Sequence, residues 1–477
     1  MPSKGITVYS YISVEDYVVE FTVPKQQLRR TSADNFTAGD LEVESSNIAG
    51  LQNFVGQFKW EVFYHGEDVD SPVLIGSAYC DINSLTGKVE GGTMAATATC
   101  KAITTDHAII TYGFYSAGHG EFGLTNRDQC YVTICPVLNR AWMGAVAPPG
   151  SLEAQKPFSR FVLAAPHDNG MNSMQFCDAI FKHLDHGMVG ELRKIAPALQ
   201  AFDHLPDHLL LDKLPDIVYG VAITQKKEIS IMLDLGARYF EFRPAKLLPM
   251  FQKLGVLPDK FYFQHACIPG LPFDEFLNQL VTFLDRYPAE IVTIHIRSDN
   301  LLKECRKPTE DEIATMLTDA CAQARSERLT WGSSECFRQP IDILRQDGKR
   351  LICVIEAEKY DSWTAEAYAT LHADPILKRF EEMTTEGQES TDLTILQCQA
   401  TSQSIKEVFV HSVLAAHAAS SCLSSTKAAI DMHTLPWIRQ NALDRLKADK
   451  NIIIMNDFID GATCDTAIEL SRTRLLA

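Results

Sequence analysis

Side chains able to transfer protons or to bind an anion follow several short apolar runs in this chain of 477 residues. They are His167, Asp168, Glu241, Arg243, Gln264, His265, Arg297 and Asp457. A histidine beside a carboxylate suits general acid–base catalysis, and the planar guanidinium of arginine suits stabilising a developing oxyanion. These residue types therefore make the ends of the apolar runs the first place to look for chemistry.

Each of these residues also has a structural explanation. A single histidine is more often a surface or satisfied core residue than a catalytic one. Glu241 and Arg243 point to the same face of a strand and could form an ion pair, and Asp457 could cap a helix. Polar groups gathered at the ends of separate apolar strands are nevertheless costly to bury. The occurrence of all these residues together is therefore stronger evidence for a functional site than any one of them alone.

The elements that must position these side chains alternate from residue 158 onward between apolar runs and helical stretches. We interpret as strands residues 161–165, 239–242, 261–264, 291–296, 351–355, 393–398 and 452–455, and as helices residues 230–235, 273–287, 310–325 and 435–447. This alternation implies βαβ units and a mostly parallel sheet, and the number of strands favours a closed TIM-type α/β barrel. Catalytic side chains of that fold lie at the carboxyl ends of the strands.

The first third of the chain has a different pattern, in which short strands are separated by turn residues. The expected strands are residues 6–13, 17–23, 54–64, 73–82, 93–103, 107–115 and 129–137. About seven short strands without an intervening long helix predict an antiparallel β-sandwich. We therefore expect three parts: a sandwich over residues 1–140, a linker over 141–157 and a catalytic barrel over 158–477.

Composition narrows the classes of partner. The formal net charge is −17, which disfavours nucleic-acid binding because that requires many cations facing phosphates. The chain shows no signal-peptide pattern and no apolar run long enough for a membrane span. The thirteen cysteines are scattered without a zinc-ligand spacing, which suggests reduced thiols. We expect a cytoplasmic protein, for which peripheral membrane contact remains open.

Two familiar motifs are imitated, and two others are absent. Residues 118–123 spell GxGxxG, but the following segment is interpreted as a strand, so we expect a glycine-rich hairpin loop. His204 and His208 are four residues apart, but Pro206 lies between them and no HExxH glutamate accompanies them. The chain has neither a GxSxG elbow nor a P-loop lysine. Serine hydrolase, NTPase and zinc protease functions lose support.

Five elements, in order, resemble the X domain of phosphatidylinositol-specific phospholipases C. They are the loop at residues 166–170, the stretch from Gln225 to Arg243, the histidine His265, the strand entry at 287–292 and the late strand that ends in Asp457 and Phe458. The resemblance covers roughly residues 158–457. The family usually has glycine after the second histidine, where this chain has Ala266.

The resemblance implies a role for each matching residue. His167 would be the general base, oriented by Asp457, and His265 the general acid, supported by Asp168. Arg243 would bind the phosphate oxygens as charge builds on them.

Three further residues are expected to contact the substrate. Arg297 falls where the bacterial enzymes carry a basic substrate-contacting residue. Glu241 and Gln264 complete the expected substrate-binding set.

The resemblance also bears on metal dependence. The calcium-dependent branch of the family has asparagine after the first histidine and an acid at the position of Arg243, whereas this chain has Asp168 and Arg243. Arginine would supply the positive charge that Ca²⁺ otherwise brings. The chain thus resembles the metal-independent branch, which implies no metal and no other cofactor.

The expected function is that of a phosphodiesterase, a hydrolase or lyase of the phospholipase C-like type. Its partner would be a small phosphorylated substrate or a phospholipid headgroup, and a cyclic phosphate product is left open. Two alternatives remain: the same barrel with altered chemistry on another metabolite, or a catalytically inactive binding protein.

Overall fold

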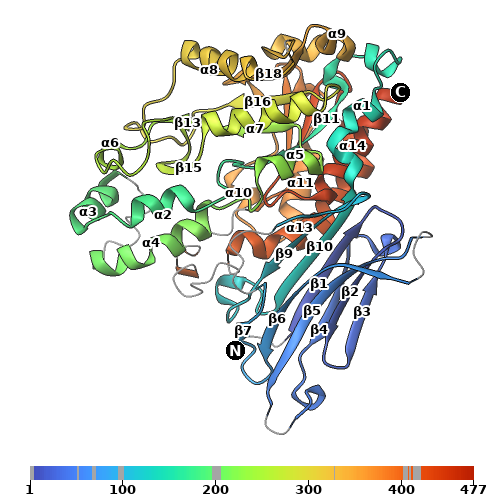
Figure 1. Cartoon of the computed structure of the whole chain (residues 1–477), viewed down its shortest axis with the longest axis vertical. Helices are drawn as coiled ribbons and strands as arrows, with labels where there is room; N and C mark the ends of the chain where they lie inside the picture. Colours follow the sequence, from blue (N-terminus) through green and yellow to red (C-terminus); the bar gives the residue numbers. More distant parts are fainter. Residues whose placement is uncertain are drawn as a thin grey trace.

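A computed structural model gives the structure of the chain. It describes residues 5–50, 53–66, 71–94, 101–195, 206–326, 328–400, 407, 410–411 and 421–477. His204 and parts of the expected strand at 93–103 lie outside these residues. Figure 1 shows a strand-rich N-terminal part (blue) below a larger part that carries most of the helices (green to red).

The N-terminal part consists of two five-stranded sheets that share one hydrophobic core. The first has the order β4-β1-β10-β9-β8, with β4 (Thr37–Glu42), β1 (Gly5–Ile12), β10 (Asp128–Pro136), β9 (Ala108–Tyr115) and β8 (Ile103–Thr104). The second has the order β3-β2-β5-β6-β7, with β3 (Gln26–Arg30), β2 (Tyr17–Val23), β5 (Val55–Tyr64), β6 (Val73–Asn83) and β7 (Val89–Gly91). In β5, buried Phe58, Trp60 and Val62 alternate with more exposed residues, as in a half-buried strand. The two sheets are consistent with the predicted sandwich.

Two features differ from the prediction. The pair β1–β10 is parallel, so the sandwich is not purely antiparallel. The chain passes through the second sheet between these strands, and this long excursion allows it to return in the same direction. Strands β3 and β4 were not predicted, because their residues are mostly polar or half-exposed. The GxGxxG segment does lie in the loop between the antiparallel strands β9 and β10, as predicted.

The C-terminal part is built on two four-stranded sheets whose strand pairs are all parallel. One has the order β11-β21-β20-β19, with β11 (Val162–Pro166), β21 (Asn451–Asn456), β20 (Leu393–Gln397) and β19 (Lys359–Asp361). The other has the order β12-β16-β18-β17, with β12 (Tyr239–Phe242), β16 (Val292–Ile296), β18 (Lys349–Ile355) and β17 (Thr330–Gly332). The backbone N–H of Arg238 donates to Ala164 O at 3.1 Å, which places β12 beside β11. The predicted parallel arrangement is confirmed for these strands.

Barrel closure stays a prediction, because within the described residues the two sheets end at β17 and β19. The expected third barrel strand is in fact antiparallel. It forms β14 (Tyr262–His265) between β13 (Pro244–Ala245) and β15 (Ile268–Pro272). Only two residues separate β14 from β15, and so short a connection permits only an antiparallel hairpin.

Helices surround these sheets. They are α1 (Trp142–Val146), α2 (Gln175–Phe181), α3 (His186–Ile195), α4 (Asp207–Ala222), α5 (Ile229–Leu235), α6 (Pro249–Gln252), α7 (Phe273–Arg286), α8 (Glu310–Ala322), α9 (Ile341–Gln346), α10 (Ala365–Tyr368), α11 (Asp374–Glu382), α13 (Cys422–Arg445) and α14 (Gly461–Leu476). Helix α7 buries Phe276, Leu280 and Leu284 along one face, as its spacing predicts. No described helix combines the length and apolarity that crossing a bilayer requires.

The expected linker at residues 141–157 is buried in part, although Leu152 is 81% exposed. Trp142, Met143 and Ala154 are buried in the same cluster as the strands of the C-terminal part. The domain boundaries at 140 and 157 stay a prediction.

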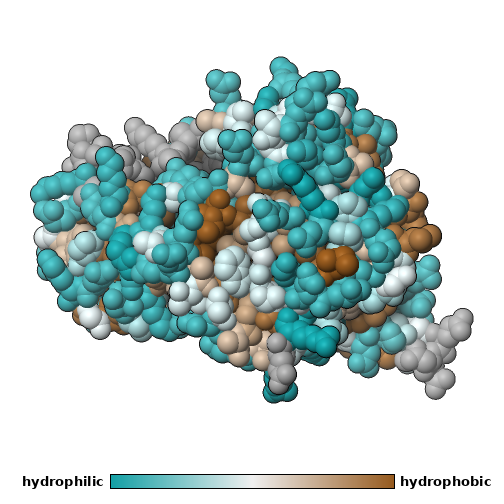
Figure 2. All heavy atoms as spheres, turned by 90° about the horizontal axis from the view of Figure 1, so that it is seen from above, coloured by the Kyte–Doolittle hydropathy of each residue, from teal (hydrophilic) through white to brown (hydrophobic). Residues whose placement is uncertain are grey.

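The first sheet of the sandwich also packs against the C-terminal part. Tyr9, Tyr11 and Ile109 belong to the hydrophobic cluster that includes α13 and α14. Arg439 of α13 donates to the hydroxyl of Tyr11 at 2.7 Å. In Figure 1, α13 and α14 lie along the boundary between the two parts. On the face shown in Figure 2, hydrophilic residues predominate and hydrophobic ones gather in small groups.

Candidate active site

The ends of β11 and β21 bring the first histidine to its carboxylate. The two strands are parallel and Pro166 pairs with Asn456, so the next residues, His167 and Asp457, emerge side by side. The Nδ1 of His167 lies 2.7 Å from Oδ1 of Asp457. The backbone N–H of His167 donates to Asn456 O at 2.9 Å, which continues the strand pairing. Strand register thus sets this pair.

The ends of β12 and β16 supply a second charged pair. Glu241 is opposite His295 in the register, which brings Arg297 close to Glu241. A guanidinium nitrogen of Arg297 bonds to Oε2 of Glu241, and its Nε donates to Asp299 Oδ1 at 2.8 Å. The other oxygen of Glu241 accepts the backbone N–H of Asp168 at 3.0 Å. Glu241 therefore holds the loop that follows β11.

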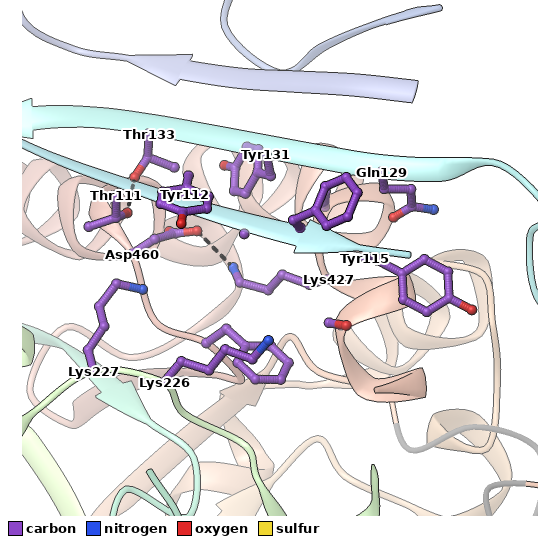
Figure 3. Close-up of a pocket in the computed structure, with 15 residues that line it drawn as sticks. Thr111, Tyr112, Tyr115, Gln129, Tyr131, Thr133, Lys226, Lys227, Lys427 and Asp460 are labelled. Carbon is purple, nitrogen blue, oxygen red and sulfur yellow. Dashed lines mark hydrogen bonds and ion pairs between the residues drawn. The ribbon is translucent and has the colours of Figure 1, made fainter. Parts of the chain in front are cut away.

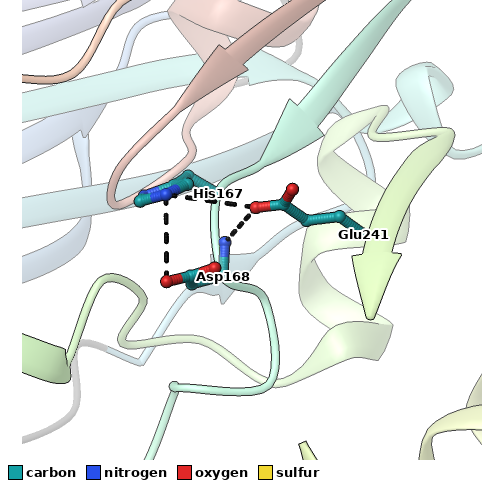
Figure 4. Close-up of side chains that lie close together, drawn as sticks. All are labelled: His167, Asp168 and Glu241. Carbon is teal, nitrogen blue, oxygen red and sulfur yellow. Dashed lines mark hydrogen bonds and ion pairs between the residues drawn. The ribbon is translucent and has the colours of Figure 1, made fainter. Parts of the chain in front are cut away.

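Asp168 lies between the two histidines. Its Oδ2 is 3.8 Å from Nε2 of His167 and 3.7 Å from Nε2 of His265, and its Oδ1 accepts a hydrogen bond from Arg243. Figure 4 shows His167 facing both Asp168 and Glu241. The structure therefore brings seven of the eight predicted residues into one connected cluster.

Gln264 is the eighth predicted residue and lies beside the cluster. Its backbone N–H donates to Arg243 O at 3.0 Å. Its side chain is fully buried, and neither amide atom has a hydrogen-bond partner among the described residues. Its contact with a substrate stays a prediction.

Exposure differs sharply within the cluster. The side chains of His167 and His265 are 22% and 33% exposed, whereas those of Asp168, Arg243 and Glu241 are at most 5% exposed. The two imidazoles are thus the most exposed groups of the cluster, and the charged residues beside them hold them in place.

The two histidines have opposite pKa shifts. Burial disfavours the charged form of His167, but Asp168 and Asp457 outweigh it and raise the pKa of His167 to about 9. Burial and the nearby Arg243 outweigh Asp168 at the second histidine and lower the pKa of His265 to about 4. At neutral pH the site holds one charged and one neutral imidazole.

The carboxylates differ as well. Burial opposes ionisation of Asp168, but Arg243 and the histidines lower its pKa below the usual value. Arg297 similarly lowers the pKa of Glu241 against the effect of burial. Burial raises the pKa of Asp457, although His167 acts in the opposite direction.

The residues that brace the histidine loop were not predicted from the sequence. Thr224 donates from its hydroxyl to His167 O at 3.0 Å, and Gln225 donates to His167 O and Asn456 O, both at 3.0 Å. Gln225 stands in the motif that resembles the phospholipase family, which was a signal without an assigned role. Asp299 was also missed, although it follows Arg297 by only two residues.

Three residues of the predicted cluster could also hold a metal ion. One ligand atom each from His167, Asp168 and Glu241 lie within 4.8 Å of one another. Both carboxylates already accept hydrogen bonds from Arg243 and Arg297, so a bound cation would lie beside two guanidinium groups. The donor set fits a metal, but the charges around it oppose one.

Comparison with known proteins gives only distant similarity. No family model matches the chain, and no curated protein matches it in sequence. Among solved structures, it is similar to the phosphatidylinositol-specific phospholipase C of Listeria monocytogenes, at 11% identity and a TM-score of 0.38, over 70% of this chain and 98% of that one. A pentafluoro-Phe form of the Staphylococcus aureus enzyme has 11% identity and a TM-score of 0.42 over the same shares.

Proposed function

We propose that the protein is a phosphodiesterase of the phospholipase C-like type. The observation that carries the proposal is the placement of Asp168 between two reachable imidazoles, with Arg243 bound to its other oxygen. Two proton-transfer groups beside a guanidinium are what an in-line displacement at a phosphodiester requires.

His167 acts as the general base in this proposal. Its Nδ1–H donates to Asp457, which leaves Nε2 to accept the proton of the attacking hydroxyl. The hydroxyl oxygen forms a bond to phosphorus while the bond from phosphorus to the leaving oxygen breaks. His265 gives its proton to that leaving oxygen.

The role proposed for arginine is to stabilise the negative charge on the phosphate oxygens. The Nε of Arg243 is buried without a hydrogen-bond partner among the described residues, so it is a donor left over for a ligand. Arg297 already donates hydrogen bonds to Glu241 and Asp299. Its main proposed role is therefore to hold Glu241 in place, and contact with the substrate is its second role.

The proposed roles need neutral His167 and protonated His265, which is the minor arrangement before substrate binds. An anionic phosphodiester between the imidazoles favours a proton on His265, because opposite charges attract at short range. The reaction then proceeds through this less populated protonation state.

Substitution of the two histidines and the arginine tests the proposal. Purified wild type, His167→Ala, His265→Ala and Arg243→Ala are assayed on inositol, choline and ethanolamine phosphodiesters. Each variant should lose about 10²-fold or more in kcat/KM on whichever ester the wild type cleaves. His183→Ala, on an exposed helix end, is the control and should keep wild-type activity. Full turnover by both histidine variants would refute the two-histidine mechanism.

A metal-dependent hydrolase is the second candidate, because of the His167, Asp168 and Glu241 donor set. EDTA treatment followed by addition of Ca²⁺, Mn²⁺ or Zn²⁺ separates the two. Activity unchanged by EDTA supports the first proposal, and activity lost and restored by one ion supports the second. A protein that binds phosphodiesters without turning any of them over would instead be a binding protein.

A further inference from the structure

The loop that carries Asp457 is short and strained. It consists of Asp457, Phe458 and Ile459, between the end of β21 at Asn456 and the N-cap of α14 at Asp460. Phe458 has a φ of 46°, in the left-handed region that side chains disfavour. Such a conformation persists only where the surrounding structure holds it, so contacts from neighbouring elements must fix this loop.

Both ends of the loop are attached to one buried ammonium group, that of Lys427 in α13. At the far end, the Nζ of Lys427 forms an ion pair with Oδ2 of Asp460 at 3.0 Å. Figure 3 shows Lys427 directed at Asp460, in a cavity between α13 and the strands β9 and β10. At the near end, the connection passes through Asp431, one turn further along α13. Lys427 bonds to Oδ2 of Asp431, and Oδ1 of Asp431 accepts the side-chain amide of Asn456 at 2.8 Å.

All four residues of this network are buried. Asn456 and Asp431 are at most 1% exposed, Asp460 is 3% exposed and Lys427 is 9% exposed. Buried ion pairs contribute little net stability, because each charge loses its hydration, and apolar side chains of similar volume often stabilise a fold as well or better. Hydrogen-bonded charges are directional, however, and a fully connected network can fix where a loop lies.

The loop also contacts the backbone of the first histidine. The backbone N–H of Phe458 donates to Thr224 O at 2.7 Å, and the hydroxyl of Thr224 donates to His167 O at 3.0 Å. One side of the loop thus follows His167 through Thr224, and the other side is held by the network. Release of either end from the network would move the Asp457 carboxylate relative to the imidazole.

We propose that Lys427 is a positioning residue of the candidate active site. It holds both ends of the loop and thereby keeps Oδ1 of Asp457 at 2.7 Å from Nδ1 of His167. This role rests on the proposed function, because it serves the proton transfer assigned to His167. Lys427 acts through Asp457, which sets the tautomer and orientation of the imidazole, and not on the substrate itself.

Kinetic coupling tests the positioning role. Lys427→Met removes the ammonium group, and Asp457→Ala removes the carboxylate through which it acts. On whichever phosphodiester the wild type cleaves, Lys427→Met should lower kcat about tenfold and change KM less than about twofold, because a displaced base slows the reaction more than binding. In the Asp457→Ala background, the same substitution should change kcat less than about twofold. Equal losses of kcat in both backgrounds would overturn the proposal.

Arg439→Met is the matched control. Arg439 lies on the same helix and donates to the hydroxyl of Tyr11 at 2.7 Å, in the contact with the sandwich. Its removal also takes a cation from α13, so it should lower the unfolding temperature and leave kcat unchanged. A loss of kcat as large as that in Lys427→Met would assign the effect to the packing of α13 and overturn the positioning role.

A measurement without substrate separates the positioning role from the proposed function. In protein with isotope-labelled histidine, a downfield proton resonance from Nδ1–H of His167 reports its hydrogen bond to Asp457, and Asp457→Ala assigns the resonance by removing it. The resonance should weaken and move upfield in Lys427→Met and stay unchanged in Arg439→Met. No such resonance in the wild type, or the same resonance in Lys427→Met, would overturn the positioning role even where the wild type cleaves a phosphodiester. A wild type that cleaves none counts against the proposed function, and the resonance then decides the positioning role alone.

Asp431→Ala replaces Lys427→Met if the latter does not fold. It cuts the connection to Asn456 and leaves Lys427 paired with Asp460, so no uncompensated charge is created in this network. The His167 resonance should move upfield in this variant as well. An unchanged resonance in Asp431→Ala would overturn the proposal.

Discussion

At the scale of single residues, the opposite pKa shifts of the two histidines set the expected pH dependence. The pKa is raised to about 9 for His167 and lowered to about 4 for His265. Activity needs one proton shared by the pair, so kcat/KM should fall below about pH 4, where both are protonated, and above about pH 9, where neither is. A pH profile of kcat/KM measures this. A rate that keeps rising through pH 10 would contradict it.

The same bell-shaped profile results whichever histidine is the base, so a second experiment must assign the roles. A nitrophenolate leaving group needs no proton, whereas an alkoxide does. We expect the loss in His265→Ala to shrink to less than about tenfold on a nitrophenyl phosphodiester, while the loss in His167→Ala persists. Ratios of kcat/KM for the two substrates provide the measurement. The opposite result would exchange the two roles.

The residue after the second histidine has a backbone conformation that favours glycine. Ala266 has a φ of 59°, in the left-handed region that a side chain disfavours. Ala266→Gly should raise the free energy of unfolding by about 0.5 kcal/mol, because relief of strain exceeds the added entropy of the unfolded chain. Urea unfolding measures the change. Ala314→Gly, within helix α8, is the control and should lower stability by about 1 kcal/mol.

At the scale of elements, the sequence predicts buried strands well and their partners poorly. Residues 239–242 and 452–455 form strands as predicted, since short, largely apolar runs of this kind are typical of buried strands. Their side chains at the strand ends could therefore be anticipated. The antiparallel pairing of β14 could not, because apolar periodicity is the same for either direction.

The site shows the same division. That Asp457 would meet His167 was implied by the resemblance to the phospholipase family, and the parallel strands β11 and β21 that end together are the physical reason. The bracing by Thr224 and Gln225 could not, because it comes from a segment between α4 and α5 that has no regular structure. Hydrogen bonds to backbone oxygens leave no pattern in the sequence.

A buried acid at the start of β10, Asp128, makes the stability of the sandwich depend on pH. Burial raises the pKa of Asp128 to about 8, although the N–H of Ala117 donates to it. The folded state therefore holds a proton that the unfolded state has lost above about pH 4, so this contribution to stability declines as pH rises toward 8. Asp128→Asn should raise the unfolding temperature more at pH 8 than at pH 5. Equal shifts at both pH values would contradict this origin.

At the scale of the whole molecule, the two parts meet so closely that they should unfold together. A Cβ added to Gly461, at the start of α14, would lie 2.6 Å from Cβ of Cys135 in β10. Atoms that close to the backbone cannot move without shifting a strand or a helix. Gly461→Ala should therefore destabilise the protein by about 2–3 kcal/mol and lower the unfolding temperature of both parts at once.

Gly190 offers a matched control for that substitution. It lies in helix α3, and a Cβ added there would meet nothing within 4 Å. Gly190→Ala should be neutral or stabilising by up to about 1 kcal/mol, because alanine favours the helix. Scanning calorimetry distinguishes the cases: one cooperative transition that shifts down in Gly461→Ala alone indicates a coupled molecule. Two transitions, of which only one moves, would show that the sandwich and the C-terminal part unfold independently.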